Sequence, residues 1–327
     1  MGDREQATAY WTVAPGHGEL RTEPLPEPGP DDVVVRALHS GISRGTELLV
    51  HGGRVPSSIA ERMRAPFQSG DFPGPVKFGY LSVGVVEHGP DELVGRQVFC
   101  LYPHQDRYVV PAASVLPIPE GIPARRAALT GAVETATNAL WDAAPRIGDR
   151  IAVVGGGMVG GAVAALLQRF PLDRLELVDV DPRRRNVADR LGVRLVEPDH
   201  ASPECDLVVH VSGTAAGLAK SLELLGDEGE VIEVSWYGDG DVAVPLGAAF
   251  HPRRLTIRAS QVSEVAASRR ARRSHTDRLR LALRLLGDDR FDALISGSSP
   301  FAELPDTMQR LASGELQALC HVIDYEP

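Results

Sequence analysis

Three glycines near residue 155 carry the strongest chemical pattern in the 327-residue chain. Gly155, Gly157 and Gly160 form a G-x-G-x-x-G sequence directly after an apolar, strand-like run. The first glycine permits a tight turn, the second lets the backbone approach a pyrophosphate, and the third lets a helix pack closely on a strand. The helix would begin with Met158 and Val159, whose free first-turn amides would bind phosphate. The pattern therefore predicts a dinucleotide-binding turn.

An acidic residue supports this prediction and bears on the choice between the two nicotinamide dinucleotides. Asp179 stands 24 residues after Gly155, at the end of the next strand-like run, where a carboxylate would bind the ribose hydroxyls. The same carboxylate would repel a 2′-phosphate, so NAD is favoured over NADP. Arg183 and Arg184 weaken this preference without reversing it. For the motif taken alone, a glycine-rich turn without a ligand and the similar glycines of a methyltransferase are the alternatives.

The elements that must position these residues divide the chain into two differently patterned parts. Residues 10–118 hold short β-rich pieces separated by glycine and proline, which is typical of a small barrel or sandwich. The alanine-rich segment Ala124–Ala144 is expected to be one helix. From residue 150 onward, strand-like and helix-like segments alternate, which predicts an α/β fold with a parallel sheet covered by helices on both faces. The tail is expected to add two helices and two short strands.

Two later strands of the predicted sheet end in small or aromatic residues. Ser212 and Gly213 follow one of these strands, and Ser235 and Trp236 follow the next. Ligands of open parallel sheets bind at the carboxyl ends of the strands. These four residues are therefore expected to line the coenzyme site.

Taken together, these features resemble the medium-chain dehydrogenase/reductase superfamily over nearly the whole chain. The resemblance is carried by SGISRGTE (40–47), FGYLSVGVVEHG (78–89), AALTGAVETATNAL (127–140), GDRIAVVGGGMVGG (148–161) and GEVIEVSWYG (229–238). It implies a GroES-like β-rich catalytic domain at 1–122 and 263–327, and a Rossmann domain with a doubly wound parallel sheet at 123–262. It also argues against a methyltransferase, which would not need the flanking barrel. Within the superfamily, SGISRGTE is similar to the branch that contains bacteriochlorophyllide dehydrogenase.

The residues that bind catalytic zinc in many members of that superfamily are replaced in this chain. Ser43 stands where a cysteine would be, Tyr80 and Leu81 stand where histidine and glutamate would be, and the second cysteine would fall near Gly131 or Ala132. The cysteine-rich lobe that holds a structural zinc is also missing. A catalytic zinc site needs about three protein ligands, normally cysteine, histidine or carboxylate. Zinc-independent chemistry is expected, and no residue is assigned to a metal.

Organic side chains must then handle the proton that accompanies hydride transfer. Tyr80 occupies a ligand position, and a nearby cation would lower the phenol pKa from about 10 toward a working pH. Lys77 is close in sequence, but its side chain could equally face elsewhere. Glu134 is a second acid/base candidate, and Ser43 could add a hydrogen bond to the substrate oxygen. The resemblance also implies that Arg44 contacts the coenzyme at its pyrophosphate and that Thr135 contacts it near the nicotinamide.

The composition restricts partners and setting. With 34 basic and 44 acidic residues the net charge is −10, which disfavours nucleic acid as a partner. No membrane span or targeting signal is visible, and three widely spaced cysteines predict a reduced, cytoplasmic protein. The arginines between 253 and 278 are expected to form a solvated face paired with acids, although an anionic substrate would also suit them. His104 and Gln105 lie on a polar loop without an assigned role. A homodimer is expected by analogy with the superfamily.

We therefore expect an NAD(H)-dependent, zinc-independent oxidoreductase that moves hydride between the nicotinamide and a small polar alcohol or ketone. Two alternatives stay open. One is reduction of an activated C=C bond, as in quinone-reductase-like relatives that also lack zinc. The other is a dinucleotide-binding protein that senses redox state without turning over a substrate.

Overall fold

The computed structural model describes residues 5–326, which form two compact units. The first unit comprises the chain up to Gly131 together with the residues from Ile295 onward, and the second unit is Ala132–Leu294. The bounds predicted from sequence, 1–122 with 263–327 and 123–262, differ from these units at 123–131 and at 263–294. The two units are defined by their internal contacts. The assignment of catalysis to one unit and of coenzyme binding to the other stays a prediction.

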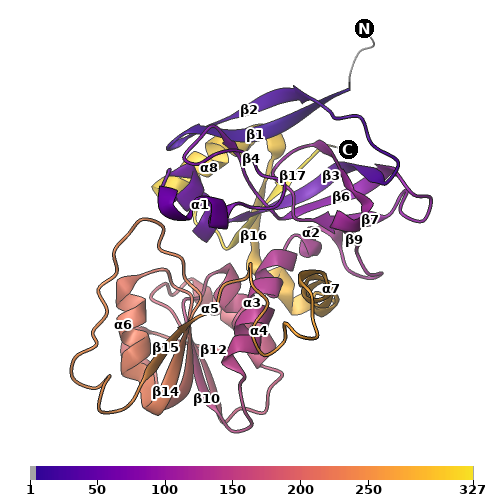
Figure 1. Ribbon diagram of the computed structural model, residues 1–327. Coiled ribbons are helices and arrows are strands. Elements are labelled where there is room, and N and C mark those ends of the chain that lie inside the picture. Colours follow the sequence, from indigo (N-terminus) through magenta and orange to yellow (C-terminus); the bar gives the residue numbers. More distant parts are fainter. Residues whose placement is uncertain (1–4, 327) are drawn as a thin grey trace. The chain divides into compact units, whose positions relative to one another are not determined.

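The second unit contains the predicted parallel sheet (Figure 1). Its strand order is β12-β11-β10-β13-β14-β15, and every neighbouring pair is parallel. The order therefore reverses between β10 and β13, which is the switch point where open α/β sheets bind ligands. This confirms the predicted doubly wound sheet. Its strands are β10 (Arg150–Val154), β11 (Arg174–Val178), β12 (Arg194–Val196), β13 (Cys205–His210), β14 (Leu225–Glu233) and β15 (Thr256–Ala259).

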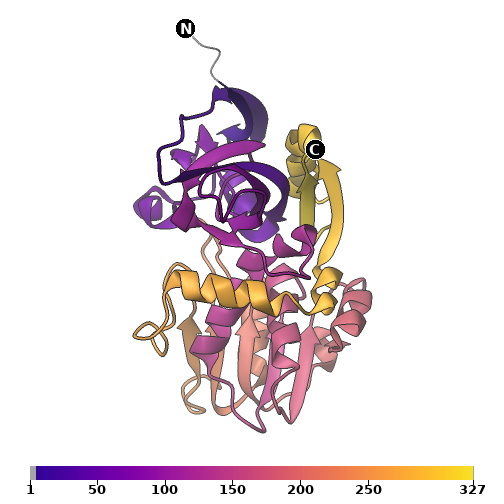
Figure 2. The ribbon, with the colours of Figure 1, turned by 90° about the vertical axis from the view of Figure 1, so that its right-hand side faces the viewer.

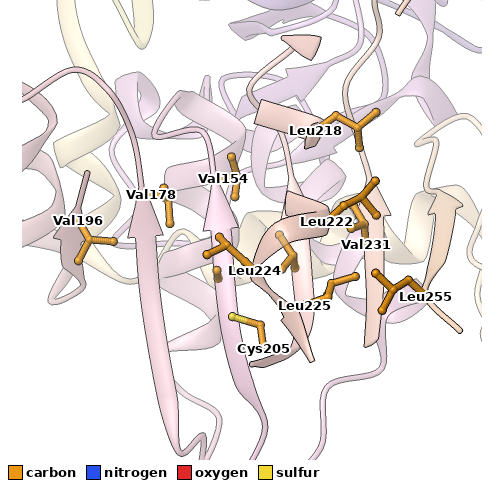
Figure 3. Packing of buried hydrophobic residues seen from close by; sticks show 12 residues of the cluster. Val154, Val178, Val196, Cys205, Leu218, Leu222, Leu224, Leu225, Val231 and Leu255 are labelled. Carbon is orange, nitrogen blue, oxygen red and sulfur yellow. The ribbon is translucent and has the colours of Figure 1, made fainter. Parts of the chain in front are cut away.

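Helix α6 packs on this sheet through one apolar stripe, whereas α4 is buried along almost its whole length. Leu218 and Leu222, one turn apart on α6, pack with Val154, Val178 and Val231 in a continuous core (Figure 3). A long stretch without regular structure follows β15 and leads to α7, which crosses in front of the strands in the view of Figure 2. The helices of this unit are α3 (Thr130–Ala143, beginning in the last residues of the first unit), α4 (Met158–Leu167), α5 (Arg184–Leu191), α6 (Ala215–Leu224) and α7 (His275–Leu285), with short 3₁₀ turns at Pro198–His200 and Asp289–Leu294.

The single helix predicted for Ala124–Ala144 is wrong. The segment forms α2 (Ala124–Ala127) and α3, separated by two residues. The Thr130 hydroxyl donates a hydrogen bond of 2.6 Å to the Ala127 carbonyl, so a side chain takes the acceptor at the end of α2. The two residues at the break, Ala128 and Leu129, are neither proline nor glycine, and the nearest glycine, Gly131, lies inside α3, so helix propensity does not locate the break.

The first unit is β-rich, as the short-strand pattern predicts. A larger sheet has the order β16-β17-β3-β6-β7-β9, with β8 also paired to β3, and a smaller sheet has the order β2-β1-β5-β4. The strands are β1 (Gln6–Ala14), β2 (His17–Pro24), β3 (Asp32–Ser43), β4 (Ser69–Gly70), β5 (Val76–Lys77), β6 (Ser82–His88), β7 (Gln97–Cys100), β8 (Arg107–Pro111), β9 (Val115–Pro117), β16 (Ile295–Pro300) and β17 (Cys320–Asp324).

The residues from Ile295 onward complete this unit. The two helices and two strands predicted for the tail are present as α7, β16, α8 and β17, although α7 belongs to the second unit. β17 lies antiparallel to β3, with Cys320 opposite Ser43 and Asp324 opposite His39. The pairing holds the last strand beside the end of β3, from which α1 begins. The helices of this unit are α1 (Arg44–His51), α2 and α8 (Leu304–Ser313), with 3₁₀ turns at Ser57–Ile59, Glu61–Met63, Ala112–Ser114 and Phe301–Glu303.

The three cysteines are free and buried. Within residues 5–326, no helix combines the length and the apolar character needed to cross a bilayer.

Candidate active site

The glycine turn after β10 has the geometry that a pyrophosphate requires. Gly155 has φ +114°, and a Cβ there would lie 2.7 Å from the backbone of Ser212. A Cβ on Gly160 would lie 1.8 Å from the carbonyl oxygen of Gly155, so only glycine lets α4 start this close to the strand. A Cβ on Gly157 would meet nothing within 4 Å, so this side of the turn is open. Only glycine therefore fits at positions 155 and 160, and the space beside Gly157 is open for a bound phosphate.

The first turn of α4 offers donors to a ligand in that open space. Gly157 is the N-cap residue, and no side chain caps the helix. The amides of Met158, Val159 and Gly160 lack acceptors within the helix, as in any first turn. Amides of this kind, at the positive end of the helix dipole, bind phosphate.

Asp179 follows β11 and is held by the glycine turn itself. Its Oδ2 accepts the N–H of Gly156 at 2.5 Å, and its Oδ1 accepts the N–H of Asp181 at 2.8 Å. Arg183 and Arg184, the residues that weakened the preference for NAD, face Asp181 instead, at 2.7 Å and 3.5 Å. Their charges are therefore engaged by a carboxylate, and the pKa of Asp181 is lowered chiefly by its hydrogen bond from Arg183.

A small surface pocket beside Asp179 was not anticipated from the sequence. It measures about 340 Å³ and is lined by Val180, Glu197, Pro198 and Asp199. The Val180 side chain is 79% exposed, which is unusual for a valine directly after a buried strand. A larger pocket of about 720 Å³ around Arg169 and Asp288 contains none of the predicted site residues.

The carboxyl ends of β13 and β14 are joined by a buried histidine–glutamate pair. His210 is fully buried, and its Nδ1 lies 2.8 and 2.9 Å from the two carboxylate oxygens of Glu233 on the neighbouring strand. Its Nε2 lies 2.7 Å from the Ser212 hydroxyl. Glu233 also accepts the N–H of Ser235 at 2.7 Å and the Tyr237 hydroxyl at 2.9 Å.

This pair fixes the residues that were predicted to line the coenzyme site. The amide of Gly213 donates to the Ser235 hydroxyl at 3.0 Å, so the two loops after β13 and β14 are tied together above the pair. Burial alone would raise the pKa of Glu233, but the hydrogen bonds from His210, Ser235 and Tyr237 outweigh it, and the net pKa is lowered. Trp236 is partly exposed in the second of these loops.

In the first unit, the positions that match zinc ligands lie together. The Gly41 N–H donates to the Leu81 carbonyl at 2.9 Å, so the end of β3 that carries Ser43 lies beside Tyr80. Hydrogen bonding by the Ser43 and Thr46 hydroxyls lowers the pKa of the Tyr80 phenol. A Cβ on Gly131 would lie 3.8 Å from the Tyr80 ring and 2.5 Å from the Leu81 side chain. The fold therefore brings Ser43, Tyr80 and Gly131 to one place, as the resemblance implied.

The electrostatic setting of Tyr80 differs from the expected one. Burial and the nearby Glu47 carboxylate raise the pKa of Tyr80 to about 12, against a smaller lowering by the Ser43 and Thr46 hydrogen bonds. Lys77 does not oppose this effect, because its ammonium group pairs with Glu23 and donates to Gln105 at 2.8 Å. Of the two alternatives that the sequence left open for Lys77, the structure shows the one in which the side chain faces elsewhere. The phenol instead holds its proton at neutral pH.

Behind Tyr80 lies a buried network that sequence reasoning missed. Glu47 bonds both the Ser43 amide and the His104 ring, and His104 in turn contacts the Ser40 hydroxyl. Gln105, next to His104 in the chain, accepts a hydrogen bond from Lys77 and donates one to the Arg107 carbonyl. The sequence pointed to His104 and Gln105 only through the polarity of their loop.

Glu134 forms a buried ion pair on α3. Arg278 of α7 donates from Nε to Glu134 Oε1 at 3.0 Å and from Nη1 to the Asn138 side chain at 2.5 Å. The guanidinium also donates to the carbonyls of Val262 and Glu264, so it ties the segment before α7 to α3. Burial raises the pKa of Glu134, and Arg278 opposes this rise. The Glu134 carboxylate, which the sequence suggested as an acid/base group, is therefore bound by Arg278.

Two other predicted coenzyme contacts are placed on helices. Arg44 is the first residue of α1, and within residues 5–326 its guanidinium has no ion-pair partner, which leaves it available for an anion. Thr135 stands next to Glu134 on α3 and is partly buried.

The arginines near the end of the second unit divide into three kinds. Arg253, Arg254 and Arg258 pair with surface acids, as expected for a solvated face. Arg278 is the buried exception described above. The remaining arginines of this run are exposed, and they lie at positions 269, 270, 272 and 273.

The residues at the matching positions do not fit a zinc ion. Two of them contribute a serine and a tyrosine hydroxyl, and the third position has no side chain, whereas zinc sites use thiolate, imidazole or carboxylate ligands. A side chain at Gly131 would also collide with Leu81. Within the part of the chain that the structure describes, no group of three or more histidine, cysteine, aspartate or glutamate residues is arranged to hold a metal ion.

Comparison with known proteins gives a consistent picture. No family model matches the chain. L-threonine 3-dehydrogenase from Ruegeria pomeroyi is 28% identical over 63% of this chain, and the match spans 66% of its own length. 2-desacetyl-2-hydroxyethyl bacteriochlorophyllide A dehydrogenase from Rhodobacter capsulatus is 28% identical over 87% of this chain and 88% of its own length. An alcohol dehydrogenase from Escherichia coli CFT073, solved with NADH, has the same fold, with a TM-score of 0.76, 15% identity and coverage of 98% of this chain and 99% of its own.

Proposed function

Because these likenesses support membership of the medium-chain dehydrogenase/reductase superfamily, we propose that the chain is an NAD(H)-dependent dehydrogenase that works without zinc. Its substrate class is a small polar secondary alcohol or the corresponding ketone. The observation that carries this proposal is that Tyr80 lies beside Gly131 and beside the end of β3 that carries Ser43, at the place where the superfamily's metal ligands would stand.

The second unit supplies the coenzyme site in this proposal. The open glycine turn and the first turn of α4 would hold the pyrophosphate. Asp179 would bind the ribose hydroxyls, and the exposed Val180 would cover one side of the adenosine. The preference for NAD rests on the Asp179 carboxylate and on the pairing of Arg183 and Arg184 with Asp181. When bound, the nicotinamide supplies or accepts the hydride.

Tyr80 supplies the proton. At neutral pH its phenol is protonated, since its pKa is raised to about 12. In the direction of reduction, the carbonyl carbon gains a hydride and the substrate oxygen takes the phenol proton, which leaves a phenolate to be reprotonated from water. The hydroxyls of Ser43 and Thr46 stabilise that phenolate by hydrogen bonding. A phenol that holds its proton until an alkoxide forms suits reduction of a carbonyl better than permanent ionisation would.

Substitution of Tyr80 by phenylalanine tests this function. General acid catalysis contributes about 10²- to 10⁴-fold, so Tyr80→Phe should lower kcat by about that factor in the direction of reduction, with the ketones that correspond to L-threonine, L-galactonate and butane-2,3-diol as trial substrates. Binding of NADH, followed by its fluorescence, should be unchanged. Ser43→Ala serves as the milder companion variant. Turnover unaffected by Tyr80→Phe would refute the role of the phenol.

The same assay separates the two alternative functions. An enone such as a quinone, reduced faster than any ketone, would favour C=C chemistry. Binding of NADH without turnover of any alcohol, ketone or quinone would favour a sensor.

A further inference from the structure

A buried carboxylate stands beside Tyr80 and belongs to no step of the proposed reaction. Glu47 is 3% exposed and its partner His104 is 1% exposed, with Glu47 Oε2 lying 2.8 Å from His104 Nε2. The other oxygen, Oε1, accepts the backbone N–H of Ser43 at 2.7 Å. One carboxylate therefore joins the loop that carries His104 to the start of α1. A buried charge is retained only where it is paired and hydrogen-bonded in this way.

His104 is fixed on both sides of its ring. Its Nδ1 lies 2.7 Å from the Ser40 hydroxyl, and that hydroxyl lies 2.9 Å from the hydroxyl of Tyr325. Tyr325 is anchored by its own backbone N–H, which donates to the Leu38 carbonyl at 3.1 Å. Both ring nitrogens are occupied, so the ring has one orientation, and Glu47 is held from β3 and from Tyr325, which follows β17 in the interior of the larger sheet.

The cap at the start of α1 differs from an ordinary serine cap. A serine at an N-cap ordinarily uses its hydroxyl to bond an amide of the first turn. Ser43 is the N-cap of α1 and makes no such bond. The end of β3 that carries Ser43 lies beside Tyr80, because the Gly41 N–H donates to the Leu81 carbonyl at 2.9 Å. The Ser43 hydroxyl, together with that of Thr46, acts on the Tyr80 phenol and lowers its pKa. Glu47 bonds the Ser43 amide, which holds the serine in place while its hydroxyl is used elsewhere.

The charge of Glu47 acts on the residues around it. Besides burial, this carboxylate raises the pKa of Tyr80, and it has the same effect on Tyr10 of β1, Tyr325 and Cys320 of β17. His104 is the basic side chain in contact with it. Glu47 thus acts electrostatically on three phenols and one thiol, and it contacts one imidazole directly.

From this geometry we propose that Glu47 and His104 form a positioning pair for Tyr80. They hold the first turn of α1 so that Ser43 and Thr46 fix the direction in which the phenol gives up its proton. The inference rests on the proposed function for its catalytic meaning, but the contact it describes can be measured without any substrate.

The first test observes the phenols directly in the coenzyme-free protein. The chain has six tyrosines, and labelling them with ¹³C at Cζ gives one signal for each, assigned by single Tyr→Phe variants. At neutral pH, Glu47→Gln should move the signals of Tyr80, Tyr10 and Tyr325. It should leave Tyr237 unmoved, because that phenol donates to Glu233 in the other unit.

Glu233→Gln is the matched control, since it removes the charge of the other buried glutamate that pairs with a histidine. It should move Tyr237 and leave Tyr80 in place. His104→Asn provides a second route to the same answer if Glu47→Gln does not fold, and it should move Tyr80 in the same sense. A Tyr80 signal that is unchanged in Glu47→Gln or in His104→Asn would overturn the proposal.

The second test asks whether Glu47 acts through Tyr80. Misplacement of a reacting group by about 1 Å costs up to about 100-fold in rate, so Glu47→Gln should lower kcat about 10- to 100-fold with little change in the KM for NADH. In a Tyr80→Phe background the same substitution should change kcat less than about 3-fold. Equal losses in both backgrounds would show that Glu47 acts independently of the phenol and would overturn the proposal.

The two proposals fail in distinguishable ways. If Tyr80→Phe leaves turnover intact while Glu47→Gln moves the Tyr80 signal, the catalytic assignment is lost and the positioning contact stands. If Tyr80→Phe abolishes turnover while the Tyr80 signal is the same in wild type and in Glu47→Gln, Tyr80 keeps its catalytic assignment and the positioning pair is refuted.

Discussion

Each unit of the molecule contains a buried histidine–glutamate pair, and the two pairs are built differently. His210 and Glu233 face each other on neighbouring parallel strands, and both lie where those strands end. His104 and Glu47 are 57 residues apart and come from a loop and a helix. The first pair is a product of sheet register, whereas the second exists only because a loop and a helix start are packed together.

The surroundings of the two pairs differ as well. The pair in the second unit contacts the Ser212 hydroxyl, the Ser235 amide and the Tyr237 hydroxyl, in the loops predicted to face the coenzyme. The pair in the first unit contacts Ser43, whose hydroxyl reaches Tyr80. We therefore expect the His210–Glu233 pair to position loops that bind the coenzyme and the Glu47–His104 pair to position the Tyr80 phenol. Substitutions in His210–Glu233 should change coenzyme binding, and substitutions in Glu47–His104 should change the chemical step.

The largest effect is expected from a third buried pair, which serves neither purpose. Arg278 is 1% exposed and holds Glu134 together with the segment before α7. Removing one partner of a buried ion pair costs about 3–5 kcal/mol, so Arg278→Met should lower the free energy of unfolding by about that amount in denaturant titrations.

Glu134→Gln distinguishes this structural role from the catalytic one suggested by sequence. If the pair is structural, the folded variant keeps its kcat while its stability falls. A loss of about 100-fold in kcat at full folding would instead restore Glu134 as an acid/base group.

The next largest effect concerns coenzyme binding at the end of β11. A hydrogen bond to a charged group is worth about 1.5–3 kcal/mol, so Asp179→Ala should weaken NADH binding about 10- to 100-fold and reduce discrimination against NADPH. Fluorescence titration with both coenzymes measures this. Asp206→Asn is the control, because Asp206 pairs with Arg150 at the opposite ends of the strands. If wild-type protein binds NADPH more tightly than NADH, the role of Asp179 is misassigned.

A smaller effect separates the two histidine–glutamate pairs directly. His210→Asn removes about one hydrogen bond beneath the loops that carry Ser212 and Ser235. A net loss of about 1 ± 0.5 kcal/mol should raise the KM for NADH by roughly 5-fold and leave kcat within about 3-fold. Glu47→Gln should show the reverse pattern. Identical patterns in the two variants would contradict the division between a pair that positions the coenzyme loops and a pair that positions the Tyr80 phenol.

The smallest effect is a dependence of stability on pH. The pKa of Glu233 is lowered in the folded protein, since hydrogen bonding outweighs burial. A lowered carboxyl pKa contributes stability above the ordinary value of 4.5, and this contribution is lost as the pH falls through the folded pKa. Glu233→Gln should therefore flatten the dependence of the unfolding free energy on pH below about 4.5, because the lowered carboxyl pKa no longer contributes. An unchanged slope would show that the hydrogen bonds do not favour the ionised form.

The elements with local patterns were predictable from the sequence. The parallel sheet and the glycine turn follow from apolar runs and glycine spacing, which report on residues close together in the chain. The division of Ala124–Ala144 was not predictable, because the break depends on one threonine hydroxyl instead of on helix propensity.

The electrostatic setting of the site was out of reach for a different reason. Lys77 lies three residues before Tyr80, yet it pairs with Glu23 across the smaller sheet. Glu47 and His104, and likewise Glu134 and Arg278, are 57 and 144 residues apart, and no spacing rule relates them. Sequence indicated which residue types could act, but the pairing of charges depends on tertiary packing.

The central claim is that a phenol with its hydroxyl partners performs the work that an ion performs in zinc-dependent relatives. The most direct measurement is the zinc content of the purified, active protein together with its turnover after exhaustive chelation. We predict far less than one zinc per chain and turnover unchanged by the chelator. One zinc per chain, with activity lost on chelation and restored by added zinc, would contradict the account.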